Sequence, residues 1–188
     1  MPALPKASVR SSSKVRFLPQ LFLLASILVA SVMPALASQV RRLNLEQMSQ
    51  RASRIFHGHC LSITVGVDPA LGQKVTVVTF APYRSLKGGV HGKLKLKLLG
   101  DQTPGAATAE ATEGIPRFEE GEDVVLFLYG DSGSGLTSPV GFGQGKFKVI
   151  PDKSHRLQAV NGFANERLLQ GLSPAAQGKL GARAQRLE

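Results

Sequence analysis

Short runs of β-branched and aromatic residues, separated by Gly, Pro and Asp, recur through most of this sequence and constrain its fold more than any other feature. Runs of this kind with regularly spaced turn residues are typical of strands in a small antiparallel domain. We expect strands at 54–65, 74–83, 93–98, 124–129 and 143–150, and a short last one at 157–160. No helical pattern alternates with them. The sequence therefore predicts a mainly β fold, a small OB-like barrel or a sandwich of five to six strands with one short N-terminal helix.

Two of these runs also predict positions in the sheet. Residues 93–98 alternate lysine and leucine, which places three lysines on one face of a strand and three leucines on the other. Residues 124–129 are apolar throughout, which is typical of a strand covered on both faces, so we expect the central strand there, paired with the strand that follows. Pro82 indicates that the end of the second strand leaves the sheet or lies at an edge.

The expected N-terminal helix begins after Asn44. The Asn44 side chain can cap the helix while Gln47 reaches back to complete a capping box, and Leu43 and Met48 occupy the positions of a hydrophobic staple. At the other end of the chain, residues 173–188 are mainly Ala, Gly, Gln and basic types. Such a segment has little apolar surface to offset the entropy of ordering, so the sequence predicts a flexible tail. Residues 100–116 are expected to form a long loop.

The first 37 residues have the composition of a signal peptide. Four basic residues and no acid precede an apolar run at 21–32, and Ala35-Leu36-Ala37 forms a small-residue cleavage site before Ser38. The apolar run is shorter than the ~20 residues of a membrane-spanning helix, so we expect cleavage near Ala37/Ser38 and no membrane span afterwards. The predicted organisation is a signal peptide at 1–37, one β-rich domain at 38–172 and the tail, exported to the periplasm or the medium.

Cys60 is the single cysteine, so an exported form has no intrachain disulfide. Its place inside a predicted strand indicates a small buried hydrophobe rather than a reactive thiol. Removal of residues 1–37 takes away four basic residues and lowers the net charge from +10 to +6. That charge suits a mildly anionic partner, an unknown protein or an envelope component, and we do not expect nucleic acid as a partner.

Four segments carry a resemblance to known proteins. They are 55–60, Leu86-Lys87-Gly88, the approach Gly114-Ile115-Pro116-Arg117-Phe118-Glu119-Glu120-Gly121-Glu122, and Gln144-Gly145-Lys146-Phe147. Over residues 44–162 the chain resembles an uncharacterised family of exported bacterial proteins. The same order of segments is similar to the netrin-like OB-barrel domains that include tissue inhibitors of metalloproteinases. This second resemblance implies a barrel-like fold.

The inhibitors differ from this chain in the residues that carry out inhibition. They share a mature N-terminal cysteine that meets a catalytic zinc, and several disulfides, whereas the predicted mature terminus here is Ser38. The resemblance therefore implies no zinc-blocking residue in this chain.

Gly130-Asp131-Ser132-Gly133 matches the tetrapeptide around the nucleophile of trypsin-like proteases, and His59-Cys60 resembles the segment around their histidine. A triad depends on geometry, and a mature chain of this length is too short for the two barrels of that fold. Gly-Asp-Ser-Gly is also a common turn sequence. We expect a hairpin loop there and no catalytic residue.

His57 and His59 are two residues apart on a predicted strand, so both project from one face and could bind a metal. Two ligands do not make a site, and nothing in the spacing of His91 and His155 brings them near. We therefore expect a solvent-facing or hydrogen-bonded pair, with no metal and no cofactor.

Charged runs give two further candidates. Glu119, Glu120, Glu122 and Asp123 could offer oxygens to calcium, but they lack the spacing of a calcium loop, and a solvated turn is the simpler interpretation. Lys93, Lys95 and Lys97 are candidates for binding an anionic polymer. The alternative is that they protect an exposed sheet edge from pairing with another chain.

These patterns favour an exported, non-catalytic binding or structural module. Two alternatives from other classes stay open. One is a small hydrolase or metal-dependent enzyme that uses His57, His59 or Ser132. The other is an inhibitor or accessory factor of an exported protease.

Overall fold

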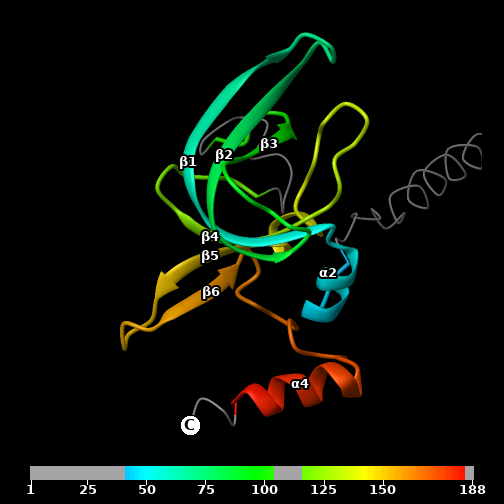
Figure 1. Ribbon diagram of the computed structural model, residues 1–188, viewed down its shortest axis with the longest axis vertical. Coiled ribbons are helices and arrows are strands. Elements are labelled where there is room, and N and C mark those ends of the chain that lie inside the picture. Colours follow the sequence, from blue (N-terminus) through cyan, green and yellow to red (C-terminus); the bar gives the residue numbers. More distant parts are fainter. Residues whose placement is uncertain (1–40, 104–115, 185–188) are drawn as a thin grey trace, which may run out of the picture. The chain divides into compact units, whose positions relative to one another are not determined.

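The computed structural model describes residues 41–103 and 116–184. The predicted signal peptide and its cleavage site lie outside these residues, as do most of the predicted 100–116 loop and the last four residues. Six antiparallel strands form one sheet in the order β3-β2-β1-β4-β5-β6 (Figure 1). The strands are β1 (Arg54–Asp68), β2 (Gln73–Lys87), β3 (Leu94–Leu99), β4 (Asp123–Leu128), β5 (Lys146–Pro151) and β6 (Leu157–Asn161).

The predicted mainly β class with five to six strands is confirmed. The strands belong to one sheet that is not closed into a barrel, since β3 and β6 end the order. The loop after β4 nevertheless reaches the β3 edge, where Lys97 and Leu136 form an isolated parallel bridge. A short 3-10 helix, η1 (Phe142–Gln144), follows this loop and precedes β5.

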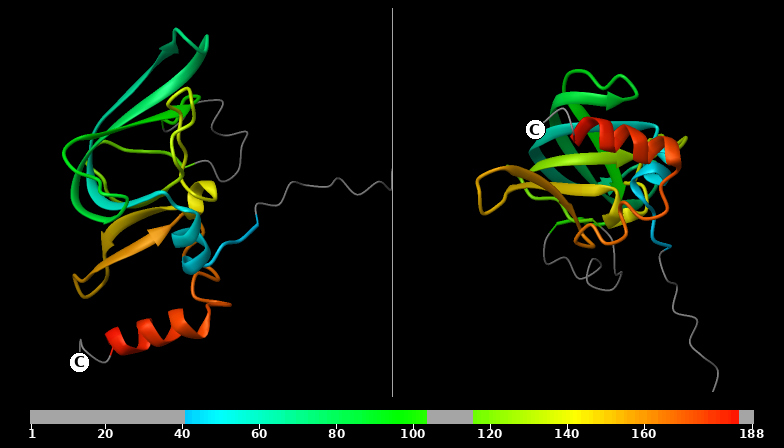
Figure 2. Two further views of the ribbon diagram at one scale, coloured as in Figure 1. Left: turned by 45° about the vertical axis from the view of Figure 1, so that its right-hand side comes forward. Right: turned by 90° about the horizontal axis from the view of Figure 1, so that it is seen from below.

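The long hairpin of β1 and β2 bends along its length, as two of the views show (Figures 1 and 2). Three register shifts interrupt its pairing, one of them between His57 and Gly58. A Cβ at Gly58 would lie 2.8 Å from the Ala81 carbonyl oxygen, so this close approach of two backbones requires glycine. Buried residues alternate along the first half of β1, whereas none from Leu61 onward is buried.

Pro82 lies inside β2, which continues to Lys87 instead of ending near Tyr83. The pairing of β2 with β3 stops at Phe80, so beyond that residue β2 has a free edge on one side. Pro82 faces the bulge at Gly58 on the other side. Pro82 therefore lies at a sheet edge, as one form of the prediction has it, but the strand does not end there.

β4 separates two hydrophobic clusters, as expected for the central strand. Val124, Leu126 and Leu128 belong to one cluster, which also contains Phe56, Cys60, Val78, Phe80, Leu96, Leu98 and Phe118. Phe127 points the other way into a second cluster, which contains Leu43, Met48, Ala52, Ile55, Val140 and Phe147. The continuous apolar run therefore reflects burial on both faces.

Helix α2 (Leu45–Arg51) covers the second cluster and begins as predicted. The Asn44 side chain accepts a hydrogen bond from the Gln47 amide, and the Gln47 side chain accepts one from the Asn44 amide, which completes the capping box. Leu43 and Met48 are both buried in the second cluster. Gln144, which is 2% exposed, fixes the approach to the helix by accepting from the Leu43 amide at 2.7 Å.

The C-terminal segment differs from its prediction. The sequence predicts a flexible tail from Ser173 onward, but residues Pro174–Ala184 form helix α4. The Ser173 hydroxyl accepts from the Ala176 amide at this helix start, and Ser173 itself is tied to Glu46 of α2. A tertiary contact far away in the sequence thus anchors a segment whose composition indicates no order. No helix among the described residues is long and apolar enough to cross a membrane.

Candidate functional site

The two predicted histidines lie on one face, where both rings contact Tyr83 of β2. Ring centroids are 5.1 Å apart for His57 and Tyr83 and 6.4 Å apart for His59 and Tyr83. His59 Nδ1 lies 2.8 Å from an Asp123 carboxylate oxygen, which also accepts from the Tyr83 hydroxyl. Partial desolvation and this hydrogen bond raise the pKa of Tyr83. The expectation that both histidines share a face is confirmed.

These groups do not assemble a metal site. Within residues 41–103 and 116–184, no three His, Cys, Asp or Glu side chains converge as ligands. His91 lies in the β2–β3 connection and His155 in the β5–β6 turn, and neither joins the pair. The Asp123 carboxylate orients His59, but no nucleophile hydrogen-bonds to either ring among the described residues.

Ser132 belongs to a turn. Its hydroxyl contacts the Ser134 hydroxyl at 2.9 Å and accepts from the Leu136 amide, and its neighbour Asp131 pairs with Arg54. No hydrogen bond joins Ser132 to a histidine in the described part of the chain. Cys60 is fully buried, and desolvation, aided by Glu122, raises the pKa of its thiol to about 11. Neither residue has the surroundings of a nucleophile.

The lysine stripe lies on the edge strand of the sheet. Lys93 precedes β3, Lys95 is exposed on it, and Lys97 is held by Asp68 with 2.7 Å between Nζ and Oδ2. That hydrogen bond lowers the pKa of Asp68. Leu96 and Leu98 on the opposite face are buried, which confirms the predicted alternation. An edge position with exposed lysines fits protection of the edge.

The four acidic residues at and just before the start of β4 take four different partners. Glu119 pairs with Lys148, Glu122 with Lys146, Asp123 with His59, and Glu120 accepts from the Ile63 amide. The arrangement therefore uses acids to attach the approach segment to neighbouring strands rather than to coordinate calcium.

A buried ion pair joins the approach segment 114–122 to the segment 144–147. Lys146 Nζ lies 2.6 Å from a Glu122 carboxylate oxygen, and the two side chains are 12% and 2% exposed. Desolvation lowers the pKa of Lys146, and the attraction of Glu122 opposes that shift. The Lys146 ammonium also donates to the Arg117 carbonyl and lies 4.6 Å from the centroid of the buried Phe118 ring. This network fixes the position of the Arg117 backbone, from which the Arg117 side chain extends.

Two residues further along β5, a second lysine–glutamate ion pair is exposed to solvent. Lys148 Nζ lies 2.7 Å from a Glu119 oxygen, with the side chains 47% and 56% exposed. The hydrogen bond raises the pKa of Lys148 and lowers that of Glu119. Exposed pairs of this kind contribute ~0–1 kcal/mol to stability. Lys148 can therefore exchange Glu119 for another carboxylate at little cost.

An asparagine pair, Asn161 and Asn165, orders the turn that follows β6. Asn161 accepts from the Phe163 and Asn165 amides, while Asn165 accepts from the Asn161 amide and donates to the Ala159 carbonyl. These bonds stabilise a left-handed backbone at Asn165, where φ is 61°. They fix the backbone of the turn that carries Phe163.

Arg42 stacks on this ring. Its guanidinium carbon lies 3.7 Å from the Phe163 centroid, while the nearest Glu166 oxygen is 3.9 Å from Arg42 Nη2. Stacking of this kind orients the planar guanidinium and leaves its edge N–H groups available to an acceptor.

Together these elements line an open cavity of about 650 Å³, which we call the basic pocket. It is lined by Arg42, Pro116, Arg117, Gly143, Lys146, Lys148, Ile150, Val160, Asn161, Gly162 and Phe163. Four of these are cationic, and Ile150, Val160 and Phe163 place apolar surface beside the charges. Such a combination suits a ligand that carries a carboxylate next to an apolar group.

Most residues of the basic pocket escaped prediction from the sequence. Arg117, Lys146 and Lys148 lie in or beside the segments that carry the resemblance, but nothing in their spacing brings them together. Arg42 and Phe163 are more than 100 residues apart and meet only through the fold. The repeated Asn in Asn161-Gly162-Phe163-Ala164-Asn165 is the one local signal of a structured turn.

No protein-family model matches the sequence, and neither a curated protein nor a solved structure is significantly similar to it. The resemblance to exported bacterial proteins and to netrin-like domains therefore stays a prediction.

Proposed function

We propose that this chain is an exported, non-catalytic binding module whose basic pocket holds an acidic segment of a partner protein. The observation that carries this proposal is the cavity of about 650 Å³ with four cationic side chains beside an aromatic ring. Its volume lies within the ~300–1,000 Å³ range of ligand sites in proteins. Export is supported by the sequence of residues 1–37.

The charge distribution favours a short acidic segment over a polyanion. Glu122 already neutralises Lys146, and Glu119 accompanies Lys148, so the pocket has a small net charge. A polyanion would need a continuous unpaired basic groove. By contrast, Ile150, Val160 and Phe163 offer apolar surface that an adjacent side chain of a peptide can cover.

Three of the four cations have distinct parts in binding. Lys146 is buried and positions the Arg117 backbone, so it acts on the ligand indirectly. Lys148 exchanges its exposed partner for the ligand carboxylate. Arg42, oriented by Phe163, donates from the opposite wall. A catalytic function lacks comparable support, because the described residues bring no nucleophile, base and acid together.

Two double charge reversals test this proposal. Arg117→Glu with Lys148→Glu alters the basic pocket, whereas Lys93→Glu with Lys95→Glu makes the same change in net charge on the edge strand. The probe is a fluorescein-labelled tetrapeptide of alternating aspartate and leucine, read by anisotropy. We expect the first variant to bind at least about tenfold more weakly and the second to bind like the wild type.

Equal losses in both variants would mean that the probe senses overall charge and not a pocket. A wild-type chain that ignores the probe, or binds its asparagine analogue equally well, would contradict recognition of an acidic segment. Export has its own test. N-terminal sequencing of protein recovered outside the cytoplasm of cells that express the full chain should begin at Ser38, and retention of residues 1–37 would contradict it.

A further inference from the structure

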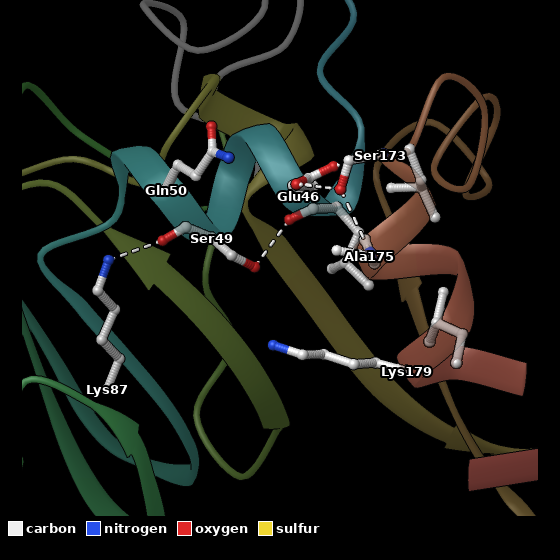
Figure 3. Close-up of a pocket in the computed structure, with 11 residues that line it drawn as sticks. Glu46, Ser49, Gln50, Lys87, Ser173, Ala175 and Lys179 are labelled. Carbon is white, nitrogen blue, oxygen red and sulfur yellow. Dashed lines mark hydrogen bonds between the residues drawn. The ribbon is translucent and has the colours of Figure 1, made fainter. Parts of the chain in front are cut away.

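A second cavity, of about 550 Å³, lies between α2 and α4 (Figure 3). We call it the helix groove. It is lined by Leu45, Glu46, Ser49, Gln50, Lys87, Leu172, Ser173, Ala175, Ala176, Lys179 and Leu180. None of these residues belongs to the basic pocket, so an inference about the groove is independent of the function proposed above.

The surface of the helix groove is mainly apolar. Leu45 is half-buried, Leu172 is 7% exposed, and Leu180 is 41% exposed although it faces the cavity. Ala175 and Ala176 are small and leave the space open. A large aliphatic side chain exposed beside a concave apolar surface is the arrangement that an apolar ligand would complete.

The one carboxylate of the helix groove is already engaged. Glu46 accepts from both the amide and the hydroxyl of Ser173, each at 2.8 Å. These hydrogen bonds lower the pKa of Glu46. The pair joins the first turn of α2 to the start of α4, so the one carboxylate that lines the groove is bound to Ser173 and not to a lysine.

Two lysines supply uncompensated positive charge. Lys87 Nζ donates to the Ser49 carbonyl at 2.8 Å, which satisfies one hydrogen-bond donor but not the charge. Lys179 forms no hydrogen bond or ion pair with any residue the structure describes. Figure 3 shows Lys179 extending from α4 toward α2 and Lys87 approaching α2 from the sheet.

We propose that the helix groove binds a single-chain anionic amphiphile, a fatty acid, with its acyl chain along Leu45, Leu172 and Leu180. Its carboxylate would lie between the Lys87 and Lys179 ammonium groups, whose aliphatic stems extend the apolar surface. Charge complementarity selects a carboxylate headgroup over a cationic or neutral one. The apolar residues line a cavity between two helices, and this geometry suits one chain better than the plane of a lipid surface.

Calorimetric titration of the full chain tests the proposal with two probes that share an acyl chain. Dodecanoate should bind, and dodecyltrimethylammonium should bind at least about fivefold more weakly. Ala175→Trp fills the groove from an exposed position and should weaken both probes by roughly tenfold. Lys87→Gln with Lys179→Gln should weaken dodecanoate and, because repulsion is relieved, should not weaken dodecyltrimethylammonium, so that the preference for dodecanoate is lost.

Lys93→Gln with Lys95→Gln is the matched control, because it removes the same charge from the edge strand and should change neither probe. Equal affinity for the two probes in the wild type, or equal losses in the two lysine variants, would overturn the proposal. So would sedimentation with anionic phospholipid vesicles without binding of free dodecanoate, since that result indicates a membrane surface. Unaltered binding by the Ala175→Trp variant would place the ligand elsewhere.

Discussion

The basic pocket and the helix groove have similar volumes, about 650 and 550 Å³, but the chain supports them differently. The basic pocket rests on the sheet, where the Lys146–Glu122 pair is almost fully buried. The helix groove rests on two short helices joined by the partly exposed Glu46–Ser173 contact. Lysine occurs at both sites. Burial makes Lys146 a structural residue, whereas the exposed Lys87 and Lys179 pair with no carboxylate among the described residues, and their charges are available to a ligand.

The largest expected effect is at the buried pair. Lys146→Met leaves the Glu122 carboxylate buried without its partner, so we expect the free energy of unfolding to fall by about 3–5 kcal/mol. Lys148→Met removes the solvent-exposed ion pair with Glu119 and should change the free energy of unfolding by less than about 1 kcal/mol. Urea unfolding of both variants measures the contrast.

A second variant separates loss of charge pairing from loss of packing. Lys146→Met with Glu122→Leu replaces both charges by apolar groups, so it should recover more than about 1 kcal/mol of the loss seen in the single variant. If Lys146→Met and Lys148→Met were equally mild, burial would not distinguish the two lysines, and the comparison would fail.

An intermediate effect is expected where α2 begins. Asn44 caps the helix, and its amide group donates to the Gln170 and Gly171 carbonyls, both at 3.0 Å. Asn44→Ala should lower the free energy of unfolding by about 1 kcal/mol. Asn44→Ser keeps a capping oxygen but loses both donors, so thermal unfolding should place it between the wild type and the alanine variant. Identical stability of all three chains would mean that the cap does not support the helix groove.

The smallest effect concerns the dependence of stability on pH at the helix groove. The pKa of Glu46 is lowered from its ordinary value of 4.5 by the hydrogen bonds from Ser173. A carboxylate with a lowered folded-state pKa contributes stability above its unfolded pKa, and this stability is lost as pH falls through the folded value. Ser173→Ala should therefore be less stable than the wild type near neutral pH, and the difference should shrink below pH 4.5.

Carbon NMR of the Glu46 carboxyl provides a direct reading of this effect. In the Ser173→Ala variant its midpoint should move up toward the ordinary value. The variant keeps the Ser173 amide, so an unchanged midpoint would show that the Ser173 hydroxyl does not hold the Glu46 carboxylate.

The sequence patterns predict the sheet well because its signals are local. The apolar run of β4, the alternation in β3 and the Asn44–Gln47 capping box each depend on residues within a few positions of one another. Burial on both faces, burial on one face and a capped helix follow from them directly.

Predictions fail where contacts connect distant segments. Helix α4 has a composition that indicates no order, and the hydrogen bonds between Ser173 and Glu46 span 127 residues. Arg42 and Phe163 meet across the fold for the same reason. The candidates that sequence does suggest, His57 with His59 and the lysines around β3, have the expected orientations, but the two cavities form elsewhere. Orientation is a local property, whereas a cavity is a property of the whole fold.

The most direct test of the central claim is to map the acidic probe peptide on the chain by proton–nitrogen NMR. Our account predicts that titration shifts the backbone amides of Arg117, Lys148, Gly162 and Phe163, with little change at Lys93, Lys95 and Lys97. Shifts confined to the β3 lysines, or spread evenly over all basic residues, would contradict a binding site in the basic pocket.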